Sequence, residues 1–108
     1  MTMRRDAILA TAAGLIDGDR AAQNGDALAT HQRIAGMWSA YLGVPIGPVD
    51  AAAMMAQLKV ARVRVNPAHA DNWIDLAGYA ALGGEMACAA ASEIAAKNHE
   101  QPATHQGE

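Results

Sequence analysis

Apolar residues recur along this chain every three to four positions, which is the period of an α-helix and not the alternation of a β-strand. Four segments show this spacing, and they cover residues 5–16, 30–42, 48–64 and 69–96. Glycine, proline and asparagine fill the connections, where they end one helix and allow the next to begin. The sequence therefore predicts an all-α bundle of four main helices. It forms one domain over residues 1–96, followed by a polar, flexible tail at 97–108.

The second predicted helix has one face that is expected to pack against the rest of the protein. Thr30 can cap its N-terminus, and the neighbouring His31 is expected to be a solvated or capping residue. Its apolar face consists of large side chains at helical spacing: Ile34, Met37, Trp38, Tyr41 and Leu42. Aromatic residues in such a stripe usually belong to the core. We therefore expect Trp38 and Tyr41 to be buried, with stacking on a base as the alternative.

Glycine and proline mark further helix ends. Gly18 follows the first helix and can adopt the left-handed conformation that closes many helices. Pro48 suits the first turn of the third helix, where Asp50 favours the positive end of the helix dipole. Gly83 and Gly84 each lower helix stability by roughly 1 kcal/mol relative to alanine. A kink or break is therefore predicted in the last helix at that point.

The composition limits the core. Of 108 residues, 27 are alanine, only 24 are Ile, Leu, Val or Met, and there is no phenylalanine. Such a core buries little apolar area per residue. We expect association between copies to complete it, so that the protein forms a homodimer or a larger homo-oligomer.

The charge and the single cysteine exclude several classes of protein. The net charge of -3 gives no basis for general nucleic-acid binding. No apolar run is long enough to cross a membrane, and Asp17 interrupts the apolar stretch that a signal peptide would require. Cys88 lies in an alanine-rich helix and is expected to be a small packing residue. These features favour a cytoplasmic location.

Two carboxylates at the start of the last helix are the first candidates for chemistry. Asp71 and Asp75 are four residues apart, so they share one helical face and could hold a Mg²⁺ ion together with substrate phosphates. Asn72 and Tyr79 could add polar contacts to a ligand. The alternative is structural: Asp71 interacts with the helix dipole, and Asp75 forms an ion pair with a cation on the third helix.

Lys59 and Arg62 supply those cations. Arginine binds phosphate through two parallel hydrogen bonds and lysine acts as a point charge, so both suit a phosphate ligand. The polar loop Asn24-Gly25-Asp26 could close over such a ligand, with an ordinary helix connection as the alternative. No phosphate-binding glycine motif, zinc-ligand spacing or nucleophile with a base partner is present, so no catalytic residue is identified.

Several short motifs resemble an uncharacterised family of small helical proteins from phages and prophages, known only as a domain of unknown function. The similarity covers about residues 5–86 and includes the following segments: Gly18-Asp19-Arg20, Asn24-Gly25-Asp26, Arg33-Ile34-Ala35, Trp38-Ser39-Ala40-Tyr41-Leu42, Met54-Met55, Leu58-Lys59-Val60-Ala61-Arg62, Asp71-Asn72 and Ile74-Asp75-Leu76-Ala77-Gly78-Tyr79. The resemblance implies a location in the cytoplasm of a bacterial host.

More distantly, the last helix is similar to a metal-binding helix of the MazG-like all-α NTP pyrophosphohydrolases, which assemble as dimers or tetramers and use Mg²⁺. This resemblance implies that Asp75 matches the terminal aspartate of the second acidic motif, with Asn72 or Asp71 in the place of its partner acid. The first acidic motif of those enzymes is absent, because the matching helix has Met55 and Lys59 where acids would stand.

Two functions are therefore expected as alternatives. In the first, a phage-type protein binds a nucleotide or a related phosphate ligand, either as a binding protein alone or as a degenerate MazG-like NTP pyrophosphohydrolase that requires Mg²⁺. Whether it is an enzyme is left open. In the second, a non-catalytic phage accessory protein acts through protein–protein contacts, and the charged residues form a structural network.

Overall fold

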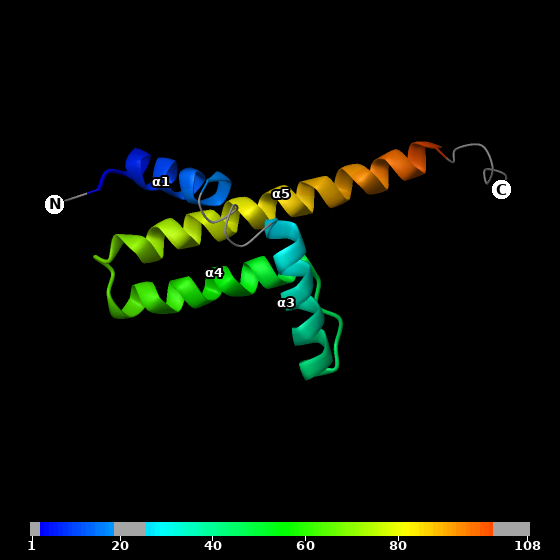
Figure 1. Cartoon of the computed structure of the whole chain (residues 1–108), viewed down its shortest axis with the longest axis horizontal. Coiled ribbons are helices and arrows are strands. Elements are labelled where there is room, and N and C mark those ends of the chain that lie inside the picture. The colour runs from blue at the N-terminus through cyan, green and yellow to red at the C-terminus, as the bar shows by residue number, and fades with distance from the viewer. Residues whose placement is uncertain (1–2, 19–25, 101–108) are drawn as a thin grey trace.

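The computed structural model describes residues 3–18 and 26–100, and the described part of the chain contains helices and no strands. The helices are α1 (Arg5–Asp17), α3 (Ala27–Leu42), α4 (Pro48–Val65) and α5 (Ala70–Glu100). Figure 1 shows α4 and α5 side by side as an antiparallel hairpin, with α1 along the first half of α5. Helix α3 packs mainly on α4 and points away from the hairpin. The all-α prediction of four helices is confirmed.

The connections obey the local rules that the sequence suggested. Gly43 closes α3 in the left-handed conformation, with φ of 73°. Pro48 opens α4, and the Asp50 carboxylate accepts a hydrogen bond of 2.9 Å from the Gly47 N–H. The Trp73 indole donates a hydrogen bond of 2.8 Å to the Pro67 carbonyl, which ties the α4–α5 turn to the first turns of α5.

Three details of the helix ends differ from the prediction. Helix α3 begins at Ala27, and its cap is Asp26 in place of Thr30, because the Asp26 carboxylate accepts a hydrogen bond of 3.3 Å from the Ala29 N–H. Gly18 ends α1 with φ of -106°, so it is not a left-handed cap. Helix α5 runs through Gly83 and Gly84 without a break and includes the first residues of the expected tail, 97–100. Residues 101–108 of that tail lie outside the described residues.

The core consists of small side chains. The buried apolar residues are Ala12, Ala35, Ala51, Ala52 and Ile74, and no large side chain in the described residues is completely buried. The helices approach closely instead. A Cβ atom added to Gly83 of α5 would lie 3.2 Å from the Ala52 Cβ of α4, and one added to Gly78 would lie 3.7 Å from Ile16 of α1. The expectation of a thin core in large residues is therefore confirmed.

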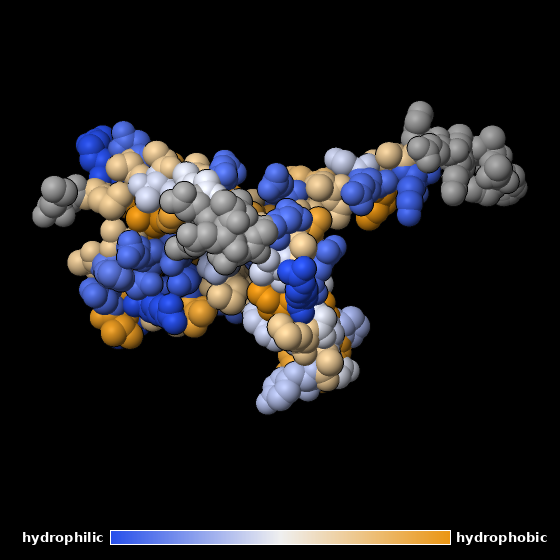
Figure 2. Space-filling model, viewed as in Figure 1, coloured by the Kyte–Doolittle hydropathy of each residue, from blue (hydrophilic) through white to orange (hydrophobic). Residues whose placement is uncertain are grey.

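The predicted burial of the second helix is wrong in two respects. Tyr41 is 88 % exposed, and Met37 and Leu42 are also exposed, although all three fall in its apolar stripe. His31, expected in solvent, is buried at 5 % exposure. The reason is the direction of α3: only its N-terminal half reaches the hairpin, so the stripe loses contact with the core toward its C-terminal end. In Figure 2 orange and beige residues lie beside pale blue ones on α3, and Trp38 is half-buried.

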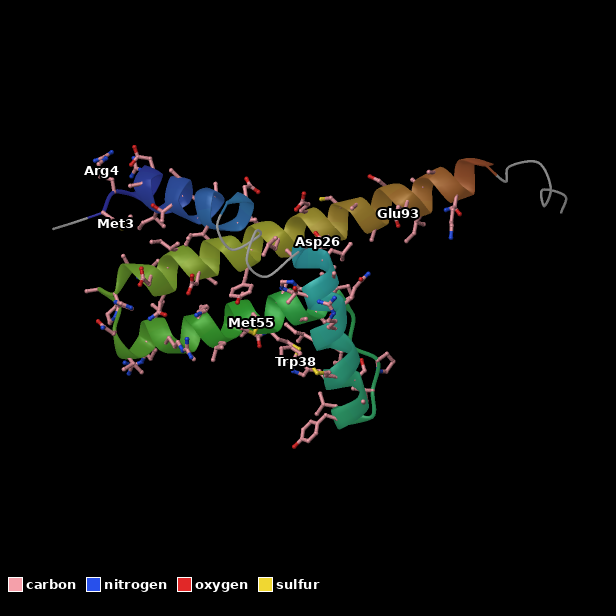
Figure 3. The ribbon with its side chains drawn as sticks, viewed as in Figure 1. Met3, Arg4, Asp26, Trp38, Met55 and Glu93 are labelled. Atoms are coloured by element: carbon pink, nitrogen blue, oxygen red, sulfur yellow. The ribbon has the colours of Figure 1, made fainter. Side chains whose placement is uncertain are left out.

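Helix α5 extends well beyond the other helices. Every side chain from Ala87 to Asn98 is exposed, and Figure 3 places Glu93 on this extended part. With 31 residues, α5 is about 46 Å long at 1.5 Å per residue. None of the helices in the described residues combines the length and the apolar content that a membrane span requires.

Candidate functional site

An ion pair between α4 and α5 forms the centre of the predicted site. The Lys59 ammonium lies 3.0 Å from an Asp75 carboxylate oxygen, and the two side chains are only 11 % and 17 % exposed. Lys59 projects from the middle of α4 toward the hairpin partner, since α4 buries the face that it shares with Ala52. A charge removed from water needs an opposite charge nearby. The pair therefore matches the structural alternative that the sequence left open for Asp75.

The remaining charged candidates face solvent. Arg62 is exposed on the last turn of α4. The Asp71 carboxylate is 77 % exposed and lies 3.8 Å from the His69 imidazole, an ion pair only when that histidine is protonated. Asp71 and Asp75 thus share a helical face as predicted, yet their contacts lead to different neighbours. In the part of the chain that the structure describes, no three His, Cys, Asp or Glu side chains form a group suited to a metal ion. Shared binding of Mg²⁺ with substrate phosphates stays a prediction.

The other predicted ligand residues that the structure describes come from the N-terminal cap of α3 and from α5. Asn24 lies outside the described residues. Asp26 caps α3 and is exposed at its N-terminal end, as Figure 3 shows. Asn72 and Tyr79 are half-buried on α5. Of the candidates, the structure brings Lys59 and Asp75 into contact.

His31 is a buried polar residue that the sequence analysis did not recognise. Its Nδ1 lies 2.7 Å from the Ala27 carbonyl one turn earlier, so in the neutral ring the proton is on Nδ1. The imidazole meets the Tyr79 ring edge-on, with 6.2 Å between the ring centres. Nε2 is buried and has no hydrogen-bond partner in the described structure. The sequence did contain a signal: His31 lies three residues before Ile34 and seven before Trp38, in line with the apolar stripe of α3.

Two apolar surfaces are also exposed. The first lies at the far end of α3 and the loop after it, and we call it the α3 tip. Its members are exposed by 63 %, 88 %, 52 % and 50 %, in the order Met37, Tyr41, Leu42 and Val44. The second is an open apolar groove between α1 and α5, lined by Arg5, Ile8, Leu9, Trp73, Leu76, Ala77 and Ala80. Exposed apolar patches of this kind mark contact surfaces in many proteins.

Comparison with known proteins gives the family. Residues 7–87 match the family described as Domain of unknown function (DUF6378). The chain belongs to this family. It is similar to the Gene 55 protein of Mycobacterium phage L5, with 48 % identity over 80 residues that cover 73 % of this chain and 51 % of the relative. The Gene 55 protein of Mycobacterium phage D29 is 37 % identical over 75 residues, which cover 69 % of this chain and 50 % of that protein.

The chain thus spans about half the length of the curated relatives that it matches. No solved structure matches it. The predicted phage-type family is confirmed, whereas neither the family nor these relatives support the more distant similarity to the MazG-like enzymes.

Proposed function

We propose that this member of the DUF6378 family is a phage accessory protein that acts by binding another protein. The observation that supports the proposal is the α3 tip, where large apolar side chains are exposed on a helix that turns away from its own core. Large apolar side chains that gather on one exposed surface commonly mark a site of contact with another protein. The Lys59 ammonium, which a phosphate ligand would need, is already paired with the Asp75 carboxylate, and this pairing favours protein binding over phosphate binding.

The chemistry of the α3 tip defines the partner. Met37 and Tyr41 are four residues apart and therefore project from one side of α3. Two anchors at this spacing insert into an apolar groove on a partner protein, as amphipathic helices commonly do. Tyrosine suits the role because its ring is apolar and its hydroxyl can still reach water or a polar rim. Leu42 and Val44 extend the contact around the end of the helix.

The test compares capture of partner proteins by three forms of the immobilised chain: the wild type, Tyr41→Ala and Val65→Ala. The extract comes from Mycobacterium, because the relatives are proteins of Mycobacterium phages. Val65 is a matched control, since it is 86 % exposed but lies at the other end of α4. A partner that depends on the α3 tip binds the wild type and Val65→Ala with dissociation constants that agree within about threefold. Tyr41→Ala weakens its binding about 30-fold, as expected for a hot-spot residue. Equal capture by all three forms would contradict the proposal.

A second proposal retains the nucleotide or phosphate ligand. It is supported by the buried, unpartnered His31 Nε2 beside Tyr79, two polar groups on the side of the hairpin that α3 covers. In this proposal Arg62 and Lys59 contact phosphate, and Asp71 and Asp75 hold Mg²⁺ for pyrophosphohydrolase-like chemistry. A nucleotide present at 100 times its Kd stabilises the fold by about 2.7 kcal/mol, which a thermal-shift screen with and without Mg²⁺ detects. The absence of a shift at millimolar nucleotide would remove this proposal.

A further inference from the structure

Helix α5 has one face without charge along its entire described length. The uncharged face follows a step of three or four residues and consists of Trp73, Ala77, Ala80, Gly84, Ala87, Ala91 and Ile94. The charged residues of this helix lie on the other side: Asp71, Asp75, Glu85, Glu93 and Lys97. The two large residues of the uncharged face are well exposed, Trp73 by 41 % and Ile94 by 60 %. Helix α1 lies beside only the first part of this face, and the apolar face of an amphipathic helix that is left uncovered favours a partner.

The two ends of this face differ in shape. Around Trp73 it is the floor of the apolar groove, with Ile8 and Leu9 of α1 as a wall. The hydrogen bond from Trp73 to the Pro67 carbonyl fixes the indole in that position. Beyond Gly84 the same face becomes a bare ridge, because no side chain from Ala87 to Asn98 is covered. One chain therefore has both an empty apolar groove and an uncovered apolar helix that could fill such a groove.

We propose that a second copy of this chain binds along the uncharged face of α5, antiparallel to the first, with a twofold axis close to Gly84. In this arrangement the ridge of each copy occupies the groove of the other, and Ile94 of one copy lies level with Trp73 of its partner. A twofold dimer requires such a self-complementary surface, in which each part of the interface appears twice. The small residues in the middle allow the two helix backbones to approach closely.

The size of the surface suits a dimer of modest affinity. The uncharged face and the residues that line the groove amount to 11 residues per copy, fewer than the roughly 20–30 of a standard stable interface. The absence of charge along the contact line is also typical of interface centres. A different partner protein would need to supply both a ridge for the groove and a groove for the ridge, whereas a second copy supplies both. This dimer does not involve the α3 tip, so the tests of the dimer and of the proposed function are independent.

The test uses the full chain in sedimentation equilibrium at concentrations up to about 100 μM, where a micromolar dimer is saturated. The wild type is expected to be a dimer of the 11.2 kDa chain. Ala91→Glu places a charge on the contact face of each copy and raises the dimer dissociation constant at least about 100-fold. Ala89→Glu is the matched control: Ala89 is also exposed and two residues away, but on the opposite side of α5. It leaves the dimer intact, and circular dichroism checks that both variants stay helical.

Thiol cross-linking in a Cys88→Ser background determines the direction of pairing. Gly84→Cys, near the twofold axis, joins two copies through a short bifunctional cross-linker, and no atom of α1, α3 or α4 lies within 4 Å of the added Cβ. Ile94→Cys does not join two copies, because the two sites are about 30 Å apart in the antiparallel pair. A monomeric wild type, an equal response to the two glutamate substitutions, or cross-linking through Ile94→Cys would overturn the proposal.

Discussion

The two halves of α5 are one continuous helix with opposite environments. Up to Met86 the helix packs against α1 and α4, buries Ile74 and holds the ion pair of Asp75. From Ala87 onward every described side chain is exposed. Alanine explains why the second half can still be helical, because it has the highest intrinsic helix propensity. The difference separates two sources of structure: tertiary packing determines the first half, and local propensity together with the proposed second copy determines the other.

The largest effect that would test this contrast is expected at Asp75. In Asp75→Ala the Lys59 ammonium is left in a mostly buried position without its carboxylate, which lowers the free energy of unfolding by about 3 kcal/mol. Asp71→Ala, one turn earlier and 77 % exposed, serves as control and lowers that free energy by less than about 1 kcal/mol, through the lost interaction with the helix dipole. Urea denaturation measures both, and a double replacement, Lys59→Met with Asp75→Leu, should recover much of the loss. Equal midpoints for the two single variants would show that the pair has no structural role.

A slightly smaller effect is expected from isoleucine truncation in each half. Ile74 is 4 % exposed, and Ile74→Ala should lower the free energy of unfolding by about 2–3 kcal/mol through lost burial and the cavity that remains. Ile94→Ala removes the same atoms from a side chain that is 60 % exposed, so the monomer loses almost nothing. Denaturation at high dilution measures the monomer. At high concentration Ile94→Ala should become destabilising, because its partner contact is then also lost. A large loss of unfolding free energy for Ile94→Ala in the dilute monomer would contradict the exposed position of Ile94.

The smallest effect distinguishes the two adjacent glycines. Gly84→Ala adds a methyl group in open space and should stabilise the dilute monomer by about 1 kcal/mol through helix propensity. In Gly83→Ala the new Cβ lies 3.2 Å from that of Ala52, so α4 and α5 must separate slightly and most of the gain is lost. Thermal unfolding of both variants side by side measures the difference. Greater stability of Gly83→Ala would show that the α4–α5 contact is looser than the structure indicates.

The candidate site illustrates how much of a set of side-chain contacts can be predicted from the sequence. Spacing placed Asp75 on a helical face and Lys59 beside the apolar seam of the neighbouring helix, so their ion pair was one of the two arrangements that the pattern allowed. The same spacing grouped Asp71 with Asp75, although the structure gives them different neighbours. Periodicity fixes which residues share a face, but the crossing of α4 determines which part of that face is covered.

Local sequence determined the four helices and most of their ends, because Gly43 permits the left-handed conformation and Pro48 and Pro67 fix φ whatever surrounds them. Tertiary structure alone decided burial. In a chain that is one quarter alanine, several faces of each helix are apolar enough to pack, so the periodicity does not select one of them. Close approach of small residues selected the faces with Ala35, Ala52 and Gly83, which left Tyr41 in solvent and enclosed His31. The physical reason is that packing depends on the fit between two surfaces, whereas a pattern along one helix describes only one of them.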